Sequence, residues 1–260
     1  MLEWIARGLA KRRITTRYPT RPDRPPAGFA GQVELLDATD APPALAAVCP
    51  TGAIRIEHGQ ATLDRGRCIL CGECVRAAPA RFTFSERYES AARARAALVL
   101  DGGGSVAEPE PSARRVLGEQ ARTLRRSIHV RHIDCGSDGA EEWEIQALWN
   151  PYYDIQRLGF FLTAAPRHAD VLLVTGGVTA PLRAPLQRTW EVMPEPKALI
   201  AVGTDACSGG LAAAGGQVAG GVDQVLGVDV YVPGSPPAPI AILEGLLLAV
   251  GLLKPQEAVR

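Results

Sequence analysis

Three cysteines at every third position constrain this chain more than any other feature. Cys68, Cys71 and Cys74 lie in the run Cys-Ile-Leu-Cys-Gly-Glu-Cys. Thiolate sulfur is a soft ligand that suits iron–sulfur clusters and zinc. A single C-x2-C pair leaves zinc, a redox dithiol and a cluster open, whereas C-x2-C-x2-C is much narrower. The run therefore predicts a metal centre on one tight loop.

The spacing resembles the bacterial ferredoxin run C-x2-C-x2-C-x3-C-P, but its last cysteine is replaced by Ala78. In two-cluster ferredoxins that last cysteine ligates the other cluster, so these three thiols need a fourth from elsewhere. Cys49-Pro50 supplies it as the end of a preceding run, whose other three cysteine positions hold Thr, Pro and Leu. We predict one [4Fe-4S] cluster, with a zinc site or unligated thiols as alternatives, on Cys49, Cys68, Cys71 and Cys74.

Composition excludes several classes of protein. The 260 residues suggest one or two domains, and 28 basic against 28 acidic residues argue against a nucleic-acid partner recruited by bulk charge. Six cysteines, four of them in the cluster pattern, favour a reducing cytosol over a disulfide framework. The longest apolar segment, 240–253, contains Glu244 and two glycines. It falls short of the roughly 18 residues of a membrane span, so we expect a buried helix.

The first half of the chain divides into three predicted segments. Residues 1–31 are predicted to form an amphipathic helix and an extended arm, the helix lying on a membrane surface, on a membrane subunit or on its own domain. Residues 32–98 are predicted to form a small α+β, ferredoxin-like domain with a helix at 43–48 and two strands around His58-Gly59. Residues 99–125, rich in glycine, proline and then arginine, predict a linker and a helix.

The segment 126–260 predicts an α/β domain. Apolar strands alternate with helical stretches, which favours a parallel sheet covered on both faces. We expect a flavodoxin-like domain with a four-stranded parallel sheet and with sites beyond the carboxyl ends of the strands. The strands are expected at 128–133, 170–175, 198–202 and 228–232, and the helices at 141–149, 155–164, 181–191 and 239–253.

Several segments resemble one family of proteins. In the second half these are 150–154 (Asn-Pro-Tyr-Tyr-Asp), 166–176 and 228–234. They resemble the small electron-transfer subunit, the B subunit, of complex I and of membrane-bound, energy-converting [NiFe]-hydrogenases of the formate hydrogenlyase type. The first half, with 15–19, the cysteine runs and 84–89, is similar to the ferredoxin subunit of the same complexes. The chain is thus predicted to fuse two such subunits.

The resemblance implies a second cluster site, and its ligands are missing here. In that hydrogenase branch four cysteines follow the strands of the second domain, one of them in a Pro-Gly-Cys-Pro-Pro turn. The turn is present here with serine in place of cysteine. Carboxylate and hydroxyl oxygens are hard donors and poor substitutes for cluster thiolates. The matching positions, a degenerate second cluster site, are Asp138, Glu141, Asp205 and Ser235.

Three interpretations of the degenerate site stay open. The hollow is filled by side chains and water, or the three carboxylates bind a hard cation such as magnesium or calcium. The third is a rearranged cluster on Cys135 and Cys207, although two thiolates fall short of the usual four. Without a cation, repulsion should raise the pKa of at least one carboxyl unless Arg131 or Arg167 pairs with it.

The resemblance implies an iron–sulfur electron-transfer subunit without catalytic residues of its own. Its expected partners are a large hydrogenase or complex I-type subunit and membrane subunits, and its expected location is the cytoplasmic face of the cell membrane. Loss of the second cluster makes proton or quinone reduction through that site unexpected. The alternatives are a structural adaptor without through-going electron transfer and an enzyme with a carboxylate metal site.

Overall fold

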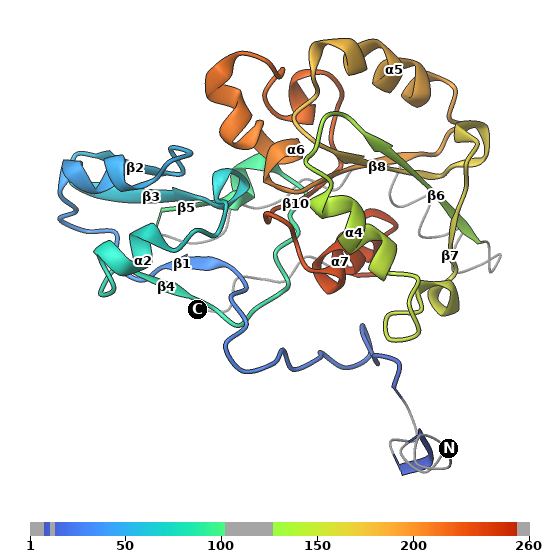
Figure 1. Cartoon of the computed structure of the whole chain (residues 1–260), viewed down its shortest axis with the longest axis horizontal. Coiled ribbons are helices and arrows are strands. Elements are labelled where there is room, and N and C mark those ends of the chain that lie inside the picture. The colour runs from blue at the N-terminus through green and yellow to red at the C-terminus, as the bar shows by residue number, and fades with distance from the viewer. Residues whose placement is uncertain (1–7, 11–13, 102–126, 254–260) are drawn as a thin grey trace.

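The structure is a computed structural model that describes residues 8–10, 14–101 and 127–253. The helix predicted at 113–125, most of the helix predicted at 1–13 and the glycine-rich linker lie outside the described residues. We call residues 32–87 the front module and residues 127–253 the back module. Figure 1 shows the front module at the left and the back module at the right.

The front module is built from two small antiparallel sheets. One pairs β1 (Val33–Leu35) with β4 (Phe82–Phe84), and the other has the order β2-β3-β5. The hairpin of β2 (Ile54–Glu57) and β3 (Gln60–Asp64) turns at His58-Gly59, as predicted, because both residues adopt positive φ. The third strand of that sheet, β5 (Val99–Leu100), comes from a later segment outside residues 32–87. The remaining elements are α2 (Glu73–Ala77) and the 3-10 helices η1 (Pro43–Val48) and η2 (Arg65–Arg67).

The back module is organised around a five-stranded parallel sheet of order β10-β9-β8-β6-β7. Numbered along the chain, this order is 2-1-3-4-5, one of the two common orders of doubly wound sheets. Every residue of β8 and β9 is buried, which fits a sheet covered on both faces. The strands are β6 (Ile128–Asp134), β7 (Phe160–Leu162), β8 (Val171–Thr175), β9 (Ala198–Val202) and β10 (Val230–Val232).

Helices cover both faces of this sheet (Figure 1). The apolar side chains of α4 (Ala140–Ala147) and α7 (Pro239–Ala249) pack on one face. Those of α5 (Ala180–Glu191) pack on the other. The shorter elements are α6 (Thr204–Ser208) and the 3-10 helices η3 (Arg95–Leu98), η4 (Ile155–Leu158), η5 (Pro166–His168), η6 (Gly210–Gly215) and η7 (Val222–Gln224).

Two predictions for the back module were wrong in detail. The helix expected at 155–164 is only the 3-10 helix η4, which ends at Gly159 with φ 88°. The aromatic and aliphatic residues that follow favour extended backbone, and they form β7 beside β6. The sheet therefore has five strands rather than four. Helix α7 ends at Ala249, short of the expected 253, and Gly251 follows with φ 69°.

The arm of residues 14–31 packs on the back module. Tyr18 is 2% exposed and belongs to the core on the α7 face. The Thr16 amide donates to the Tyr152 carbonyl at 2.8 Å, and Arg157 Nη2 donates to the Tyr18 carbonyl at 2.8 Å. The extended arm expected from the sequence thus completes the core of a module that begins more than a hundred residues later.

Residues 88–98, which we call the strap, also pack on the back module. Ala92 and Tyr231 exchange both backbone hydrogen bonds, at 2.9 and 2.7 Å, so the strap lies antiparallel against β10. Glu244 Oε2 accepts the amides of Ser90 and Ala91 at 2.8 and 3.1 Å. The strap was expected within the first domain, 32–98, yet much of its packing is with the second.

Candidate metal centre

The four predicted thiols line one pocket of the front module. Cys49 follows η1, Cys68 follows η2, and Cys74 lies in α2, so three separate elements position them. All four are free thiols; Cys68 and Cys74 are buried, whereas Cys71 is exposed. The other pocket residues are mostly apolar: Val33, Ala53, Ile54, Leu63 and Ile69, with Thr51, Gly72 and Glu73.

Backbone amides of this pocket point at the sulfurs. Ala53 N–H donates to Cys49 Sγ at 3.2 Å, and the amides of Leu70 and Val75 hydrogen-bond to Cys68 and Cys74. Such donors stabilise thiolate charge. The loop curls this way partly because Leu70 and Gly72 adopt positive φ, at 56° and 75°. Positive φ is uncommon for leucine and is tolerated where surrounding structure imposes it.

The donor set fits an iron–sulfur cluster. Burial, with the neighbouring thiols adding to it, raises the pKa of Cys68 to about 12, and burial also raises the pKa of Cys74. Four thiolates held this close need cations that share their charge, which the irons of a cluster supply. Within the ranges that the structure describes, no group of three or more His, Cys, Asp or Glu side chains converges on a position for one metal ion. A cubane does not require such convergence, because each of its four thiolates ligates a different iron.

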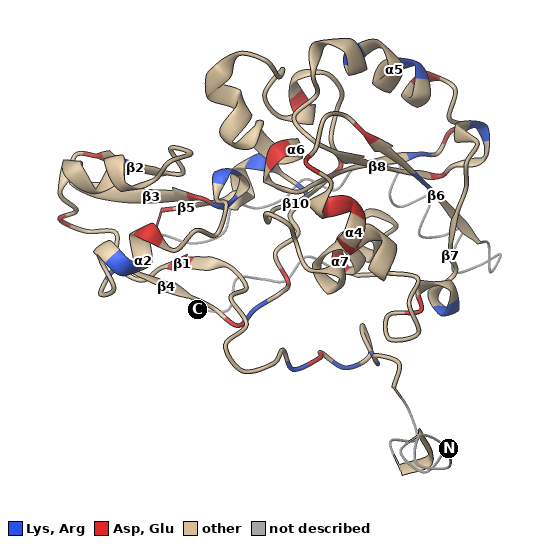
Figure 2. Ribbon diagram, viewed as in Figure 1, with Lys and Arg blue, Asp and Glu red and all other residues tan. Residues whose placement is uncertain are grey.

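The carboxylates of the degenerate site lie at the carboxyl edge of the back sheet. Asp138 and Glu141 follow β6, and Asp205 lies in α6 after β9. The charges of Asp138 and Asp205 both act on Glu141, so the structure brings these three side chains together. Figure 2 shows acidic residues on both α4 and α6 at this edge. Ser235 is exposed in the turn that follows β10. We call the three carboxylates the acidic pocket.

Burial, more than repulsion, raises the pKa values of two carboxyls in the acidic pocket. Burial raises the pKa of Glu141 to about 7, and the charges of Asp138 and Asp205 add to this. The pKa of Asp205 is raised by burial and then by Asp138. Among the described residues, neither Arg131 nor Arg167 forms an ion pair with these carboxyls. Glu141 is 3% exposed, and its Oε2 has no hydrogen-bond partner among the described residues.

Two glycines make room for the carboxyl groups. A Cβ added at Gly203, where φ is 91°, would lie 2.5 Å from Glu141 Oε1. One added at Gly210 would lie 1.7 Å from Asp205 Oδ1. The Asp138 carboxylate accepts the Ala140 amide at 3.0 Å at the start of α4. This packing favours a hollow filled by side chains.

The two further cysteines of the back module lie in its core. Cys135 is 0% exposed and Cys207 is 1% exposed, both in the apolar cluster on the α5 face. Burial raises the pKa of each thiol to about 12. Cys135 and Cys207 therefore have the surroundings typical of small apolar core residues.

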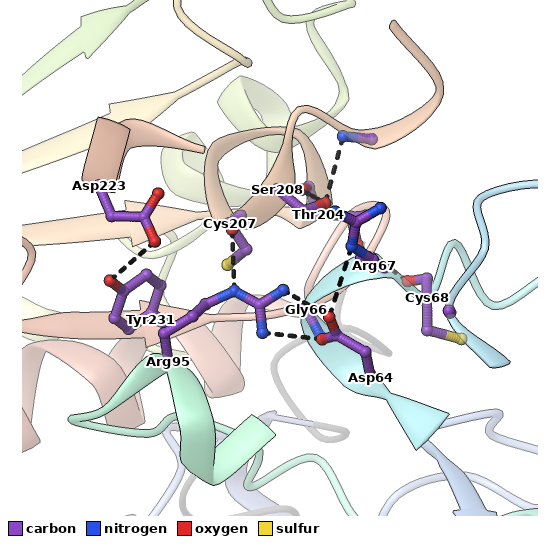
Figure 3. Close-up of polar contacts among 12 residues, drawn as sticks. Asp64, Gly66, Arg67, Cys68, Arg95, Thr204, Cys207, Ser208, Asp223 and Tyr231 are labelled. Carbon is purple, nitrogen blue, oxygen red and sulfur yellow. Dashed lines mark hydrogen bonds and ion pairs between the residues drawn. The ribbon is translucent and has the colours of Figure 1, made fainter. Parts of the chain in front are cut away.

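The sequence analysis missed the residues that join the two modules. Thr204 Oγ1 lies 2.9 Å from the Cys68 carbonyl and 3.1 Å from the Gly234 carbonyl, and Thr204 is fully buried. The Arg95 guanidinium donates to both carboxylate oxygens of Asp64, at 2.8 and 2.7 Å. We call Asp64, Arg95 and Thr204 the junction (Figure 3). No local motif marks it, because its contacts span 31 and 136 residues.

Comparison with known proteins places the back module in a family. A family profile described as NADH ubiquinone oxidoreductase, 20 Kd subunit, matches residues 138–249. Formate hydrogenlyase subunit 7 of Escherichia coli (strain K12) is 43% identical over 133 residues, 51% of this chain and 52% of the relative. Probable membrane-bound hydrogenase subunit mbhJ of Pyrococcus furiosus is 38% identical over 134 residues, 52% of this chain and 80% of the relative.

A solved structure is also similar. It is described as "Structure of the membrane-bound sulfane sulfur reductase (MBS), an archaeal respiratory membrane complex". The sequences are 26% identical, the TM-score is 0.46, and the match covers 52% of this chain and 75% of that chain.

The fold and the matches define a class of protein, the subunits of hydrogenase and complex I-like oxidoreductases. Within that class the chain belongs to the family of NADH ubiquinone oxidoreductase 20 Kd subunits. The chain spans about half the length of formate hydrogenlyase subunit 7. The front module lies outside the matched range, so its resemblance to a ferredoxin subunit stays a prediction. Among the described residues, no helix has the length and apolarity that a membrane crossing requires.

Proposed function

We propose that the chain is an iron–sulfur electron-transfer subunit of a membrane-associated respiratory or hydrogenase-like complex. A ferredoxin-like front domain holds one [4Fe-4S] cluster, and a flavodoxin-like back domain carries a degenerate cluster site. The observation that carries the proposal is the convergence of four thiols in one pocket with amide donors aimed at the sulfurs. Two relatives in the family are named as hydrogenase or hydrogenlyase subunits.

The residues of this chain have distinct roles in that proposal. Cys49, Cys68, Cys71 and Cys74 ligate the cluster, which supplies one-electron transfer. The surrounding amides offset the thiolate charge, and the apolar lining limits the access of water. The back module binds a large hydrogenase or complex I-type subunit and membrane subunits, so the chain lies peripherally on the cytoplasmic face of the membrane.

The acidic pocket gives weight to a second candidate function. Carboxyls stand at the positions where the family resemblance implies cluster cysteines, and two glycines make room for them, so current through a second cluster is not expected. A structural adaptor would keep the interface with the large subunit and lose through-going electron transfer. The two functions differ in what the front thiols do for the assembled complex.

Replacing Cys71 by Ser separates these functions. Cys71 is exposed, so the change leaves the apolar core intact while removing one thiolate. If the subunit carries current, electron flow through the purified complex is lost although all subunits still co-purify. The control is Glu57→Gln, an exposed residue of β2 that does not line the thiol pocket, and it should keep both flow and assembly. Full electron flow in the Cys71→Ser complex would reject the proposed function and favour the adaptor.

A further inference from the structure

An ion pair lies where the segment leading to the thiol loop meets α6 of the back module. Asp64 ends β3, accepts the Gly66 amide at 2.9 Å and so begins the turn of η2 that leads to Cys68. Arg95, from the strap, reaches across to Asp64 and donates through Nε to the Cys207 carbonyl of α6 at 3.2 Å. Figure 3 shows the guanidinium between these two partners, with the Cys68 sulfur turned away from them.

The Asp64–Arg95 pair is held rigidly and is partly withdrawn from water. The two side chains are 14% and 25% exposed, and both carboxylate oxygens are engaged. A bidentate guanidinium–carboxylate contact fixes both charges in place. Charges at such sites are screened less by water and salt than charges at the surface. Each member of the pair therefore acts on a charge change at the neighbouring thiol loop.

Reduction of a cluster adds one negative charge to its site. A nearby cation stabilises the reduced state and a nearby anion destabilises it, which is how a protein tunes cluster potentials. We propose that the Asp64–Arg95 pair sets the reduction potential of the cluster on the front thiols while it holds their loop against α6. Both residues act as positioning residues, and the inference rests on the proposed function.

Other charges surround the same loop. Arg67 Nε lies 3.6 Å from Asp64 Oδ2, the same oxygen that Arg95 Nη2 contacts at 2.7 Å. Arg65, whose pKa is lowered by burial, lies 4.0 Å from Glu34 and donates to the Val33 carbonyl at 3.4 Å. Basic residues thus outnumber acidic ones beside Cys68, which suits an anionic cluster.

The test is a redox titration of the full chain, monitored by EPR, of two variants that change the local charge in opposite directions. Asp64→Asn leaves a cation uncompensated, so the midpoint potential rises. Arg95→Gln removes one positive charge beside the thiol loop, so the midpoint potential falls. We expect each to change the one-electron equilibrium several-fold, where tenfold corresponds to about 59 mV. A merely structural role would move both variants in the same direction or move neither.

The chain offers a matched control in the ion pair of Glu73 and Arg76 on α2. Its side chains are 51% and 64% exposed, and it lies next to Cys74. Solvent screens such a pair, and Arg76, unlike Glu73, does not line the thiol pocket, so Arg76→Gln should shift the potential far less. If Arg95→Gln does not fold, the upward shift in Asp64→Asn decides the question. Deuterium exchange of residues 65–76 in each chain, measured by mass spectrometry, should rise in both junction variants.

The outcomes distinguish the inference from the proposed function. Iron at the front thiols with shifts of opposite sign supports both. Iron with unshifted potentials, or with shifts of the same sign, overturns the inference and leaves the proposed function standing. A wild-type chain reconstituted with iron and sulfide that carries no cluster overturns the proposed function, and the inference with it.

Discussion

Glu244 is the single charged residue of α7, a helix whose residues are all buried. Burial raises its pKa to about 8, although the amides of Ser90 and Ala91 oppose that shift by favouring the carboxylate. A buried acid in an apolar helix is costly unless it is hydrogen-bonded or protonated. Glu244 is hydrogen-bonded by the Ser90 and Ala91 amides and thereby fastens the strap to the back module.

The raised pKa of Glu244 predicts how stability depends on pH. Between the ordinary value of 4.5 and the folded value of about 8, the folded chain binds a proton that the unfolded chain has lost. Stability therefore falls as pH rises through this window, by up to about 1.4 kcal/mol per unit. Glu244→Gln should flatten the profile and gain on the wild type at high pH.

Urea unfolding between pH 6.0 and 8.5 measures this effect. The exposed Glu191, at the end of α5, provides the control, and Glu191→Gln should keep the wild-type slope. An unchanged slope in Glu244→Gln would show that its carboxyl ionises in the folded chain as it does in the unfolded one.

At the residue scale, the sequence was sufficient to predict some side chains of the candidate sites and insufficient to predict others. The four thiols were predictable because cluster ligands follow fixed local spacings. Raised carboxyl pKa values at the acidic pocket were also predictable, but burial was not, and it turned out to be the largest cause. Thr204 and Arg95 were beyond prediction, since single hydroxyl and guanidinium contacts between distant segments leave no periodic signal.

Helix α6 has five residues and connects the thiol loop, the turn at Gly234 and the acidic pocket. Its first residue, Thr204, reaches the Cys68 carbonyl and the turn at Gly234, and its second, Asp205, belongs to the acidic pocket. The thiol loop and the turn after β10 are therefore linked through Thr204, whose hydroxyl lies 2.9 Å from the Cys68 carbonyl and whose amide donates to the Gly234 carbonyl at 2.7 Å.

Replacing Thr204 by Val tests this link at nearly constant shape. The change leaves a buried Cys68 carbonyl without its side-chain donor, which should cost about 1–3 kcal/mol. Deuterium exchange should also rise in residues 68–74 and 233–236. The control is Ser208→Ala, because the Ser208 hydroxyl has only local partners: it donates to the Thr204 carbonyl at 3.0 Å and accepts from the Gly210 amide at 3.3 Å. Equal effects from both variants would contradict a special role for Thr204.

Elements were predictable where a buried pattern was long. The apolar runs of β8 and β9 and the helices α5 and α7 were expected within a few residues of their observed bounds. Strand β7 was missed because three residues after Gly159 carry no periodicity and their partner strand lies about thirty residues earlier. Helix α6 was missed because five residues between glycines resemble a loop.

At the scale of the whole molecule, the arm and the strap embed the first part of the chain in the second. Tyr18 and Tyr88 pack edge to face, 5.8 Å between ring centroids, within the core on the α7 face. A domain boundary placed at the glycine-rich linker from composition alone does not reveal this packing. The strap contacts the back module although it precedes the linker in the sequence. Such extensive packing gives the thiol loop a fixed position on the back module.

Iron and acid-labile sulfide counting, with EPR of the reduced protein, tests the central claim most directly. One cubane on the front thiols predicts about four irons and four sulfides per purified chain, and one reduced-cluster signal. The Cys49→Ser and Cys71→Ser chains should lose that signal, whereas Asp205→Asn should keep it. About eight irons per chain, or one zinc and no sulfide, would contradict the account.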